Sequence, residues 1–221
     1  MMLALPQWLC FDLDGTLVDS VPDITFSVNE MLQQLQFDVV DETVARTWIG
    51  NGAAKLIERA LTHVAGEKPS NDQLEKAKVL FFIAYEKNIA VKTTLYPGCI
   101  EVLEHFSNQN IPLACVTNKP RKFTPPLLQK LGMADFFKAL VCGDDLPTQK
   151  PDPAMLLEAV RQLAGEPGKG YMIGDSETDI ATANGAGTGA IYVSYGYNRG
   201  VSVEKYQPIC VDSLQQIPNL F

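Results

Sequence analysis

Near its N-terminus the chain reads Cys10-Phe11-Asp12-Leu13-Asp14-Gly15-Thr16-Leu17-Val18-Asp19-Ser20. The apolar residues from Trp8 to Phe11 predict a buried parallel strand, and alternation of side chains places Asp12 and Asp14 on the same face. Open α/β sheets bind ligands at this carboxyl end of their strands. Two carboxylates this close repel each other, and a hard divalent cation such as Mg²⁺ relieves the repulsion. The alternative for an Asp-x-Asp-Gly segment is a turn that caps a helix or closes a hairpin.

Three more predicted strands end in polar residues. The apolar residues 111–116 precede Thr117-Asn118-Lys119-Pro120, residues 139–142 precede Gly143-Asp144-Asp145 and then Lys150, and residues 170–173 precede Gly174-Asp175-Ser176-Glu177-Thr178-Asp179. Taken alone, Thr117 is explained by a helix N-cap, Lys150 by a solvated surface charge and Asp175 by a turn. Four strand ends that carry paired acids, a hydroxyl, a lysine and paired acids, in that order, predict one reaction centre instead.

These segments resemble the four motifs of the haloacid dehalogenase superfamily of phosphohydrolases, which match Asp12-x-Asp14-Gly15-Thr16, Thr117, Lys150 and Gly174-Asp175-x-x-x-Asp179. Further segments resemble the bacterial phosphoglycolate phosphatases within that superfamily, namely Asp12 to Asp23, Trp48-Ile49-Gly50-Asn51-Gly52-Ala53, Thr117-Asn118-Lys119-Pro120, Gly143-Asp144-Asp145-Leu146-Pro147 and Tyr195-Gly196-Tyr197-Asn198. The resemblance covers nearly the whole chain. It implies a Mg²⁺-dependent phosphomonoester hydrolase that works through an aspartyl-phosphate intermediate, with 2-phosphoglycolate as the expected substrate.

The resemblance also implies a role for each site residue. Asp12 is expected to be the nucleophile and Asp14 the general acid and base. Phosphate binding is expected from Thr117, Asn118 and Lys150. Mg²⁺ is expected to bind to the Asp12 carboxylate, the Asp14 backbone carbonyl and the Asp175 carboxylate. Two further acids are expected to support these ligands without binding the ion, namely Asp179 and Glu177.

The order of elements predicts a helical insertion in an α/β core. Apolar residues recur at helical spacing over residues 21–35 and 53–64, and a third helix is expected from Ser70 towards Ile89. From residue 96 onward, helices and apolar strands alternate, which predicts a parallel sheet. We therefore expect an α/β fold, with a doubly wound parallel, Rossmann-like sheet in a core of residues 1–19 and 94–221. Residues 20–93 are expected to form an inserted all-helical cap domain that sets substrate specificity.

Within the expected cap, Gly50-Asn51-Gly52 opens a predicted helix. Its backbone N–H groups at the positive end of a helix dipole would suit a small substrate carboxylate, although an ordinary N-cap turn explains the same residues. Arg46 and Arg59 could add a guanidinium for that carboxylate, although arginines at such positions are more often solvated charges on a helix face. His63 and His105 stand apart from acids and from metal-ligand spacing, so we interpret them as structural.

Composition and net charge limit the kinds of molecule that we expect the protein to bind. The chain has 221 residues, of which 46% are hydrophobic and 20% charged, enough for one sizeable core and a smaller second one. Its net charge of −8 opposes binding to nucleic acid or to an anionic membrane. The resemblance implies a small phosphorylated substrate as the partner. Nothing in the sequence indicates the oligomeric state.

Two further observations predict a cytoplasmic location. Residues 1–6 lack the basic and long apolar segments of a signal peptide. The five cysteines show no C-x-x-C spacing and are expected to be free thiols, namely Cys10, Cys99, Cys115, Cys142 and Cys210.

Several other functions are compatible with parts of this pattern. A receiver-type signalling module also combines clustered acids, a Thr and a Lys-Pro pair, but it is shorter and has no helical insertion. A dehalogenase has no need for a second acid at Asp14. Two alternatives stay open: a phosphomutase of the same fold, and a phosphatase for another phosphorylated acid or sugar such as N-acetylmuramate 6-phosphate.

Overall fold

The structure is a computed structural model in which residues 3–197 and 202–221 are described. Residues 1–2 of the N-terminal segment discussed above, and Asn198 at the end of the Tyr195-Gly196-Tyr197-Asn198 motif, lie outside the described residues.

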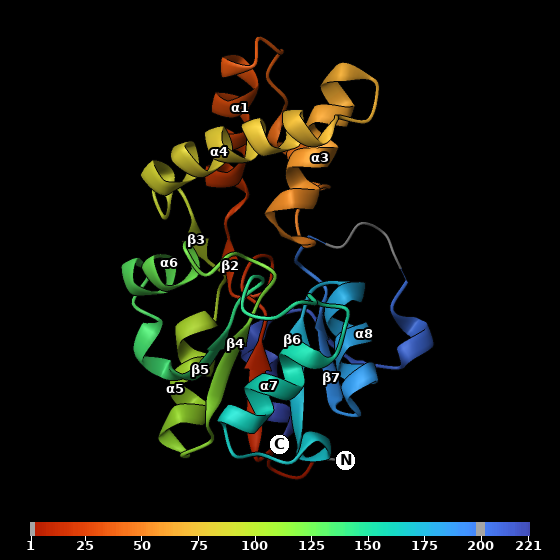
Figure 1. Cartoon of the computed structure of the whole chain (residues 1–221). Coiled ribbons are helices and arrows are strands. Elements are labelled where there is room, and N and C mark those ends of the chain that lie inside the picture. The colour runs from red at the N-terminus through yellow and green to blue at the C-terminus, as the bar shows by residue number, and fades with distance from the viewer. Residues whose placement is uncertain (1–2, 198–201) are drawn as a thin grey trace.

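The core is a six-stranded sheet with the strand order β5-β4-β1-β6-β7-β8, and every neighbouring pair is parallel (Figure 1). Its strands are β1 (Trp8–Phe11), β4 (Leu113–Val116), β5 (Phe137–Val141), β6 (Gly170–Gly174), β7 (Gly189–Val193) and β8 (Ile209–Val211). Strand β1 lies inside the sheet, and the later strands are added on both sides of it. This doubly wound order confirms the predicted α/β fold class.

Helices cover both faces of the sheet. They are α5 (Cys99–Asn108), α6 (Thr124–Lys130), α7 (Ala154–Gln162) and α8 (Glu177–Ala186), with the 3₁₀ helices η1 (Ala134–Phe136), η2 (Pro167–Lys169), η3 (Glu204–Tyr206) and η4 (Leu214–Leu220). Helices α7 and α8 pack on one face, and α5 and η4 pack on the other. Side chains of β1 alternate accordingly, because Trp8 and Cys10 join the core under α7 whereas Leu9 and Phe11 join the core under α5.

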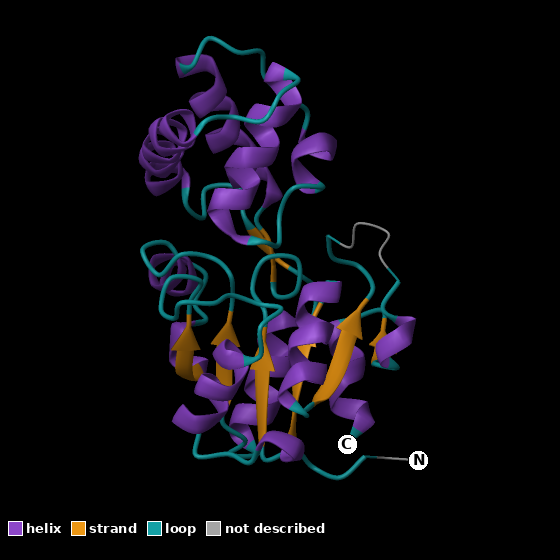
Figure 2. Ribbon diagram, turned by 45° about the vertical axis from the view of Figure 1, so that its right-hand side comes forward, coloured by secondary structure: helices purple, strands orange, loops and turns teal. Residues whose placement is uncertain are grey.

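Four helices form a separate group between β1 and β4, and the strand arrows in Figure 2 point towards it. They are α1 (Val21–Gln34), α2 (Glu42–Arg46), α3 (Gly52–Ala65) and α4 (Asn71–Asn88). The start of α4 is set by a capping box, in which the Ser70 hydroxyl accepts from the Gln73 N–H and the Gln73 side chain accepts from the Ser70 N–H. Three of the helices agree with the apolar periodicity, and the short α2 was not predicted. No helix in the described part of the chain is long and apolar enough to cross a membrane.

Two chain segments join the helical group to the core. Strands β2 (Val18–Asp19) and β3 (Thr94–Leu95) lie in these segments and pair antiparallel, which the sequence did not predict. Beside them the buried Asp23 carboxylate accepts hydrogen bonds from the backbone N–H groups of residues 91–93. The entry to the helical group is thereby bonded to its exit, which orients the group over the sheet.

Candidate active site

Polar side chains from separate strand ends meet at the edge of the sheet that faces the helical group. Asp12 follows β1, Thr117 follows β4 and Asp175 follows β6, while Lys150 comes from the loop between β5 and α7. All four residues are buried. The structure therefore brings together residues that are far apart in the sequence.

Lys150 lies at the centre of a buried ion-pair cluster. Its Nζ atom is 2.8 Å from Asp12 Oδ1 and 2.7 Å from Asp179 Oδ1, and it donates to the Val116 carbonyl at 2.7 Å. An ammonium group has three N–H donors, so these contacts account for all of them. Lys150 thus fixes the position of the Asp12 carboxylate.

The acids around Lys150 fit a divalent cation. Ligand oxygens of Asp12, Asp175 and Asp179 all lie within 4.8 Å of one another, and one lysine beside three carboxylates leaves an excess of two negative charges. Burial raises the pKa of the Asp12 carboxyl to about 7 against the opposing charge of Lys150. Burial, together with Asp179 and Asp12, raises the pKa of Asp175 well above its usual range. A hard cation such as Mg²⁺ would neutralise this excess through the oxygen ligands that it prefers.

Asp175 is positioned by the loop that carries the Asp12-Leu13-Asp14-Gly15 motif. Thr16 Oγ1 donates to Asp175 Oδ1 at 2.9 Å, and the Tyr197 backbone N–H donates to Oδ2 at 2.7 Å. Gly15 has a φ of +93°, and a Cβ atom there would collide with the Asp175 carboxylate. Glycine is therefore required at this position both by the backbone conformation and by the close approach of the acid.

The segment from Gly174 to Asp179 contains two further acids, Asp179 and Glu177. Each of them has a partner outside the cluster of Lys150, Asp12 and Asp175. Asp179 Oδ2 accepts from the Ser176 backbone N–H at 3.1 Å and from its hydroxyl at 2.6 Å, which caps α8. Glu177 lines a cavity beside Asp175, and its Oε1 atom accepts from Lys205 at 2.6 Å. Because Asp175 lines this cavity and Asp179 lies outside its described lining, Asp179 is suited to support metal ligands more than to replace one.

Asp14 has a different set of partners from Asp12. The Ser20 hydroxyl donates to Asp14 Oδ1 at 2.6 Å. The Lys119 Nζ atom lies 3.1 Å from Asp14 Oδ1 and 3.0 Å from Oδ2. The two acids of the motif are thus bound by two different lysines, Lys150 and Lys119.

Lys119 is a site residue that the sequence analysis did not single out. It is buried, it lines the same cavity as Asp12 and Asp14, and its Nζ atom lies 4.7 Å from the Tyr85 ring centroid. Burial lowers and Asp14 raises the pKa of Lys119, and the net direction is upward, so the ammonium persists at neutral pH. A signal was present in the sequence, because alternation past β4 places residues 117 and 119 on the same side.

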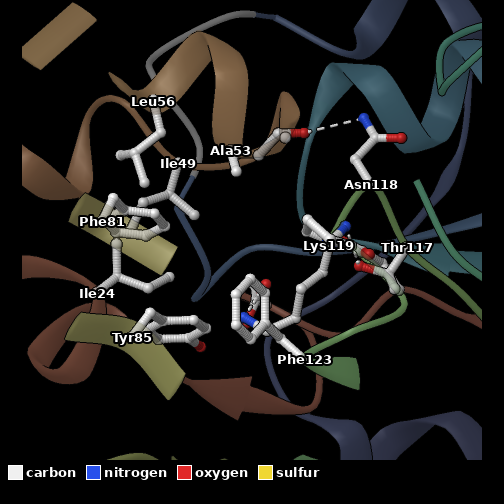
Figure 3. A pocket seen from close by; sticks show the side chains of 15 residues that line it. Ile24, Ile49, Ala53, Leu56, Phe81, Tyr85, Thr117, Asn118, Lys119 and Phe123 are labelled. Carbon is white, nitrogen blue, oxygen red and sulfur yellow. Dashed lines mark hydrogen bonds and ion pairs between the residues drawn. The ribbon is translucent and has the colours of Figure 1, made fainter. Parts of the chain in front are cut away.

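The Asn118 side chain connects the two halves of the site. It donates to the Lys150 carbonyl at 3.0 Å and to the Gly50 carbonyl at 3.3 Å (Figure 3), and it accepts from the Lys150 N–H at 3.0 Å. The neighbouring Thr117 hydroxyl oxygen accepts from the Lys119 N–H at 3.2 Å. The Asn118 side-chain amide is occupied by these contacts, so of its two donor groups only the backbone N–H stays available for the predicted phosphate contact.

A cavity lies between the strand ends and the helical group (Figure 3). It is lined by Asp12, Asp14, Ile24, Ile49, Gly50, Gly52, Ala53, Leu56, Phe81, Tyr85, Thr117, Asn118, Lys119, Pro120 and Phe123. Gly50 and Gly52 of the predicted substrate loop line this cavity. Their φ angles are +111° and +81°. The rest of the wall from the helical group is mostly apolar, and its large members are Ile24, Ile49, Leu56, Phe81 and Tyr85.

Arg46 and Arg59 lie outside the described lining of this cavity. Arg59 donates to the Trp48 carbonyl at 2.7 Å and to Asn51 Oδ1 at 2.8 Å. Arg46 pairs with Asp19 at 3.1 Å. Both guanidinium groups therefore hold the loop and the linker that flank the cavity.

The two histidines that the sequence analysis interpreted as structural, His63 and His105, are exposed. The His63 ring lies 5.4 Å from the Trp48 ring, and the His105 ring lies 4.9 Å from the Phe106 ring. Both rings thus have aromatic neighbours.

Comparison with known proteins gives matches over most of the chain. Residues 9–193 match the family model described as haloacid dehalogenase-like hydrolase. The chain is 43% identical over 220 residues to a phosphoglycolate phosphatase of Nitrosococcus oceani, which covers 99% of this chain and 98% of that one. It is 38% identical over 215 residues to phosphoglycolate phosphatase 1 of Pseudomonas aeruginosa, with 96% and 79% covered. A crystal structure from Haemophilus somnus, described as a predicted phosphoglycolate phosphatase, has a TM-score of 0.91 and 33% identity, with 98% and 99% covered.

Proposed function

Because the chain belongs to the family of haloacid dehalogenase-like hydrolases, we propose that it is a Mg²⁺-dependent phosphatase that converts 2-phosphoglycolate to glycolate and phosphate. In this proposal residues 1–19 and 94–221 form the catalytic core, and residues 20–93 form the cap that selects the substrate. The observation that carries the proposal is the position of Asp12, which lines the cavity and is held by Lys150 beside Asp175.

Asp12 acts as the nucleophile, and Asp14 acts as the general acid and base. In the first half-reaction the Asp12 carboxylate attacks phosphorus, the bond from phosphorus to the ester oxygen breaks, and Asp14 gives a proton to that oxygen. In the second, Asp14 takes a proton from water, which attacks the phosphorus of the aspartyl phosphate and restores the Asp12 carboxylate. One acid thus serves both half-reactions.

The phosphoryl oxygens need positive partners throughout the transfer. We assign the Thr117 hydroxyl and the Asn118 backbone N–H to them as hydrogen-bond donors. The Lys150 ammonium, whose three N–H donors are used by the protein, supplies them with positive charge. Held by the Asp12 and Asp175 carboxylates and the Asp14 backbone carbonyl, Mg²⁺ would neutralise charge between nucleophile and phosphate.

A small acid suits the cavity better than a sugar acid. A sugar brings several hydroxyl groups, and each needs a polar partner when it leaves water. Among the described side chains that the helical group contributes to the wall, Tyr85 alone carries a polar atom, and Ile24, Leu56 and Phe81 offer no such partner. Similarity to phosphoglycolate phosphatases over nearly the full length supports the same choice.

The direct test is phosphate release from a panel of small phosphate esters in the presence of Mg²⁺. We expect kcat/KM for 2-phosphoglycolate to exceed that for N-acetylmuramate 6-phosphate and for sugar phosphates by at least about 100-fold, which is the discrimination that unpaired polar groups produce. A higher value for the sugar acid would replace the substrate proposal. Conversion of one sugar phosphate isomer into another without phosphate release would indicate the phosphomutase.

The metal ligands can be ranked by a pair of variants. Asp175→Ala removes a carboxylate that we assign to Mg²⁺, so the Mg²⁺ concentration for half-maximal activity should rise by at least about 10-fold, with a lower maximal rate. Asp179→Ala should raise it less, since Asp179 lies outside the described lining of the cavity that Asp12 and Asp175 share. Mg²⁺ titrations of the two variants measure this order, and the reverse order would exchange the two roles.

A further inference from the structure

The positive charges near the cavity are few and most are already bound. Among the described residues that line it, Lys119 is the single cation. The three N–H donors of Lys150 go to Asp12, Asp179 and the Val116 carbonyl. The guanidinium groups of Arg46 and Arg59 lie elsewhere, bound to the linker and to the loop at residues 48–51. Lys119 contacts both Asp14 oxygens, which leaves one of its three N–H donors for a substrate carboxylate inside the cavity.

The distance between Lys119 and Asp14 suits a substrate whose carboxylate is close to its ester oxygen. To transfer a proton, an Asp14 oxygen must come within about 2.6–3.2 Å of the ester oxygen. Lys119 Nζ is 3.0 Å and 3.1 Å from the two Asp14 oxygens. In 2-phosphoglycolate the carboxylate is attached to the very carbon that carries the ester oxygen. The carboxylate therefore lies next to the point of proton transfer, beside the Lys119 ammonium.

A second group next to Lys119 lacks a hydrogen-bond acceptor. The Tyr85 side chain lines the same cavity and its hydroxyl is buried, and no acceptor for the hydroxyl proton is present among the described residues. Lys119 cannot fill this role, because an ammonium only donates. A buried hydroxyl without an acceptor is destabilising, and a bound carboxylate would supply the acceptor. Figure 3 shows both side chains at the same cavity, with Lys119 arriving from the end of β4 and Tyr85 from the helical group.

We propose that Lys119 and the Tyr85 hydroxyl together bind the substrate carboxylate, and that they select phosphate esters whose carboxylate is attached to the ester carbon. This inference rests on the proposed function and assigns its specificity to two residues. In this inference Lys119, a residue of the core, recognises the carboxylate. The Gly50-Asn51-Gly52 loop then only closes the cavity. In N-acetylmuramate 6-phosphate the carboxylate is on a side chain remote from the phosphate ester, so it cannot reach Lys119 while Asp14 reaches the ester oxygen.

The test compares two substrates that differ only in the carboxylate, 2-phosphoglycolate and 2-hydroxyethyl phosphate. For the wild type we expect the ratio of their kcat/KM values to favour 2-phosphoglycolate by at least about 100-fold. Lys119→Met should lower this ratio by about 10- to 100-fold, the size of a hydrogen bond to a charged group. Measured by competition in one mixture, the ratio is independent of the fraction of protein that is folded.

A second variant covers the case in which Lys119→Met is inactive, since it leaves Asp14 without its lysine. Tyr85→Phe removes only the hydroxyl and keeps the contact between Lys119 and Asp14, and it should lower the ratio by about 10-fold. Tyr96→Phe is its matched control, because the Tyr96 hydroxyl is also buried with no hydrogen-bond partner among the described residues, but lies outside the described lining of the cavity. Lys122→Met controls for loss of a neighbouring positive charge, as Lys122 pairs with Glu86 on the surface. Both controls should keep the wild-type ratio.

The outcomes separate this inference from the proposed function. A wild type that does not prefer 2-phosphoglycolate would overturn the proposed function whatever the variants do. A wild type with the preference, and Lys119→Met and Tyr85→Phe variants that slow both substrates equally, would overturn the inference alone. In that case Lys119 would only position Asp14.

Discussion

Replacement of Asp12 by Asn should abolish turnover, with kcat for 2-phosphoglycolate lowered by at least about 10³-fold. The amide keeps the shape of the side chain but cannot form an acyl phosphate, because its nitrogen and oxygen carry no nucleophilic charge. It also removes one of the three carboxylates that lie within 4.8 Å of one another, so Mg²⁺ binding should weaken as well. Phosphate release in single-turnover experiments measures the first effect.

A trapping experiment makes this prediction specific for covalent catalysis. Acid quenching of the wild type with substrate labelled in the phosphoryl group should yield labelled protein, and the Asp12→Asn variant should yield none. Asp72→Asn is a matched control on the exposed first turn of α4, and it should behave as the wild type. Retention of more than about one per cent of activity by Asp12→Asn would mean that water attacks the substrate directly.

The core of the site was predictable because strand ends determine it. Parallel strands place their carboxyl ends at one edge of the sheet, so acids after β1 and β6 and a hydroxyl after β4 had to converge there. Helical spacing and the Ser70 cap predicted α4 almost to its first residue, Asn71. These signals are local, and each can be interpreted without knowing what packs against it.

The partners within the site were not predictable in the same way. The pairing of Lys119 with Asp14 joins residues 105 positions apart, and no local pattern states which of two lysines takes which acid. Arg59 is a second example. From the sequence it was a candidate for binding the substrate carboxylate, whereas in the structure it donates to the Trp48 carbonyl and to Asn51 Oδ1. Long polar side chains reach several neighbours, so their partners follow from packing and not from spacing.

The β2 and β3 pairing was missed for a related reason. Two strands of two residues each carry no periodicity that a sequence can show, and only their antiparallel contact makes them a sheet. The positions of Tyr85 and Tyr197 at the site also follow from packing. The Tyr197 backbone N–H reaches Asp175, and the Tyr85 side chain reaches the cavity, because loops and helices from distant parts of the chain meet there.

Asp14→Asn should lower kcat for 2-phosphoglycolate by at least about 100-fold, because the variant can neither protonate the leaving oxygen nor activate water. The size of the loss should depend on the leaving group. With 4-nitrophenyl phosphate the departing phenolate is stable without a proton, so formation of the aspartyl phosphate should survive. Hydrolysis of that intermediate still needs a base, and it should remain slow.

This difference predicts a burst. Mixed rapidly with 4-nitrophenyl phosphate, the Asp14→Asn variant should release phenolate in an amount close to the enzyme concentration and then stall, while labelled aspartyl phosphate accumulates on Asp12. The wild type should show continuous release. Since Lys119 loses its charged partner in the variant, a thermal melt is needed to show that the protein remains folded. An unchanged rate would assign proton transfer to another acid, and a uniformly slow time course without a burst would mean that Asp14 acts before the phosphoryl group reaches Asp12.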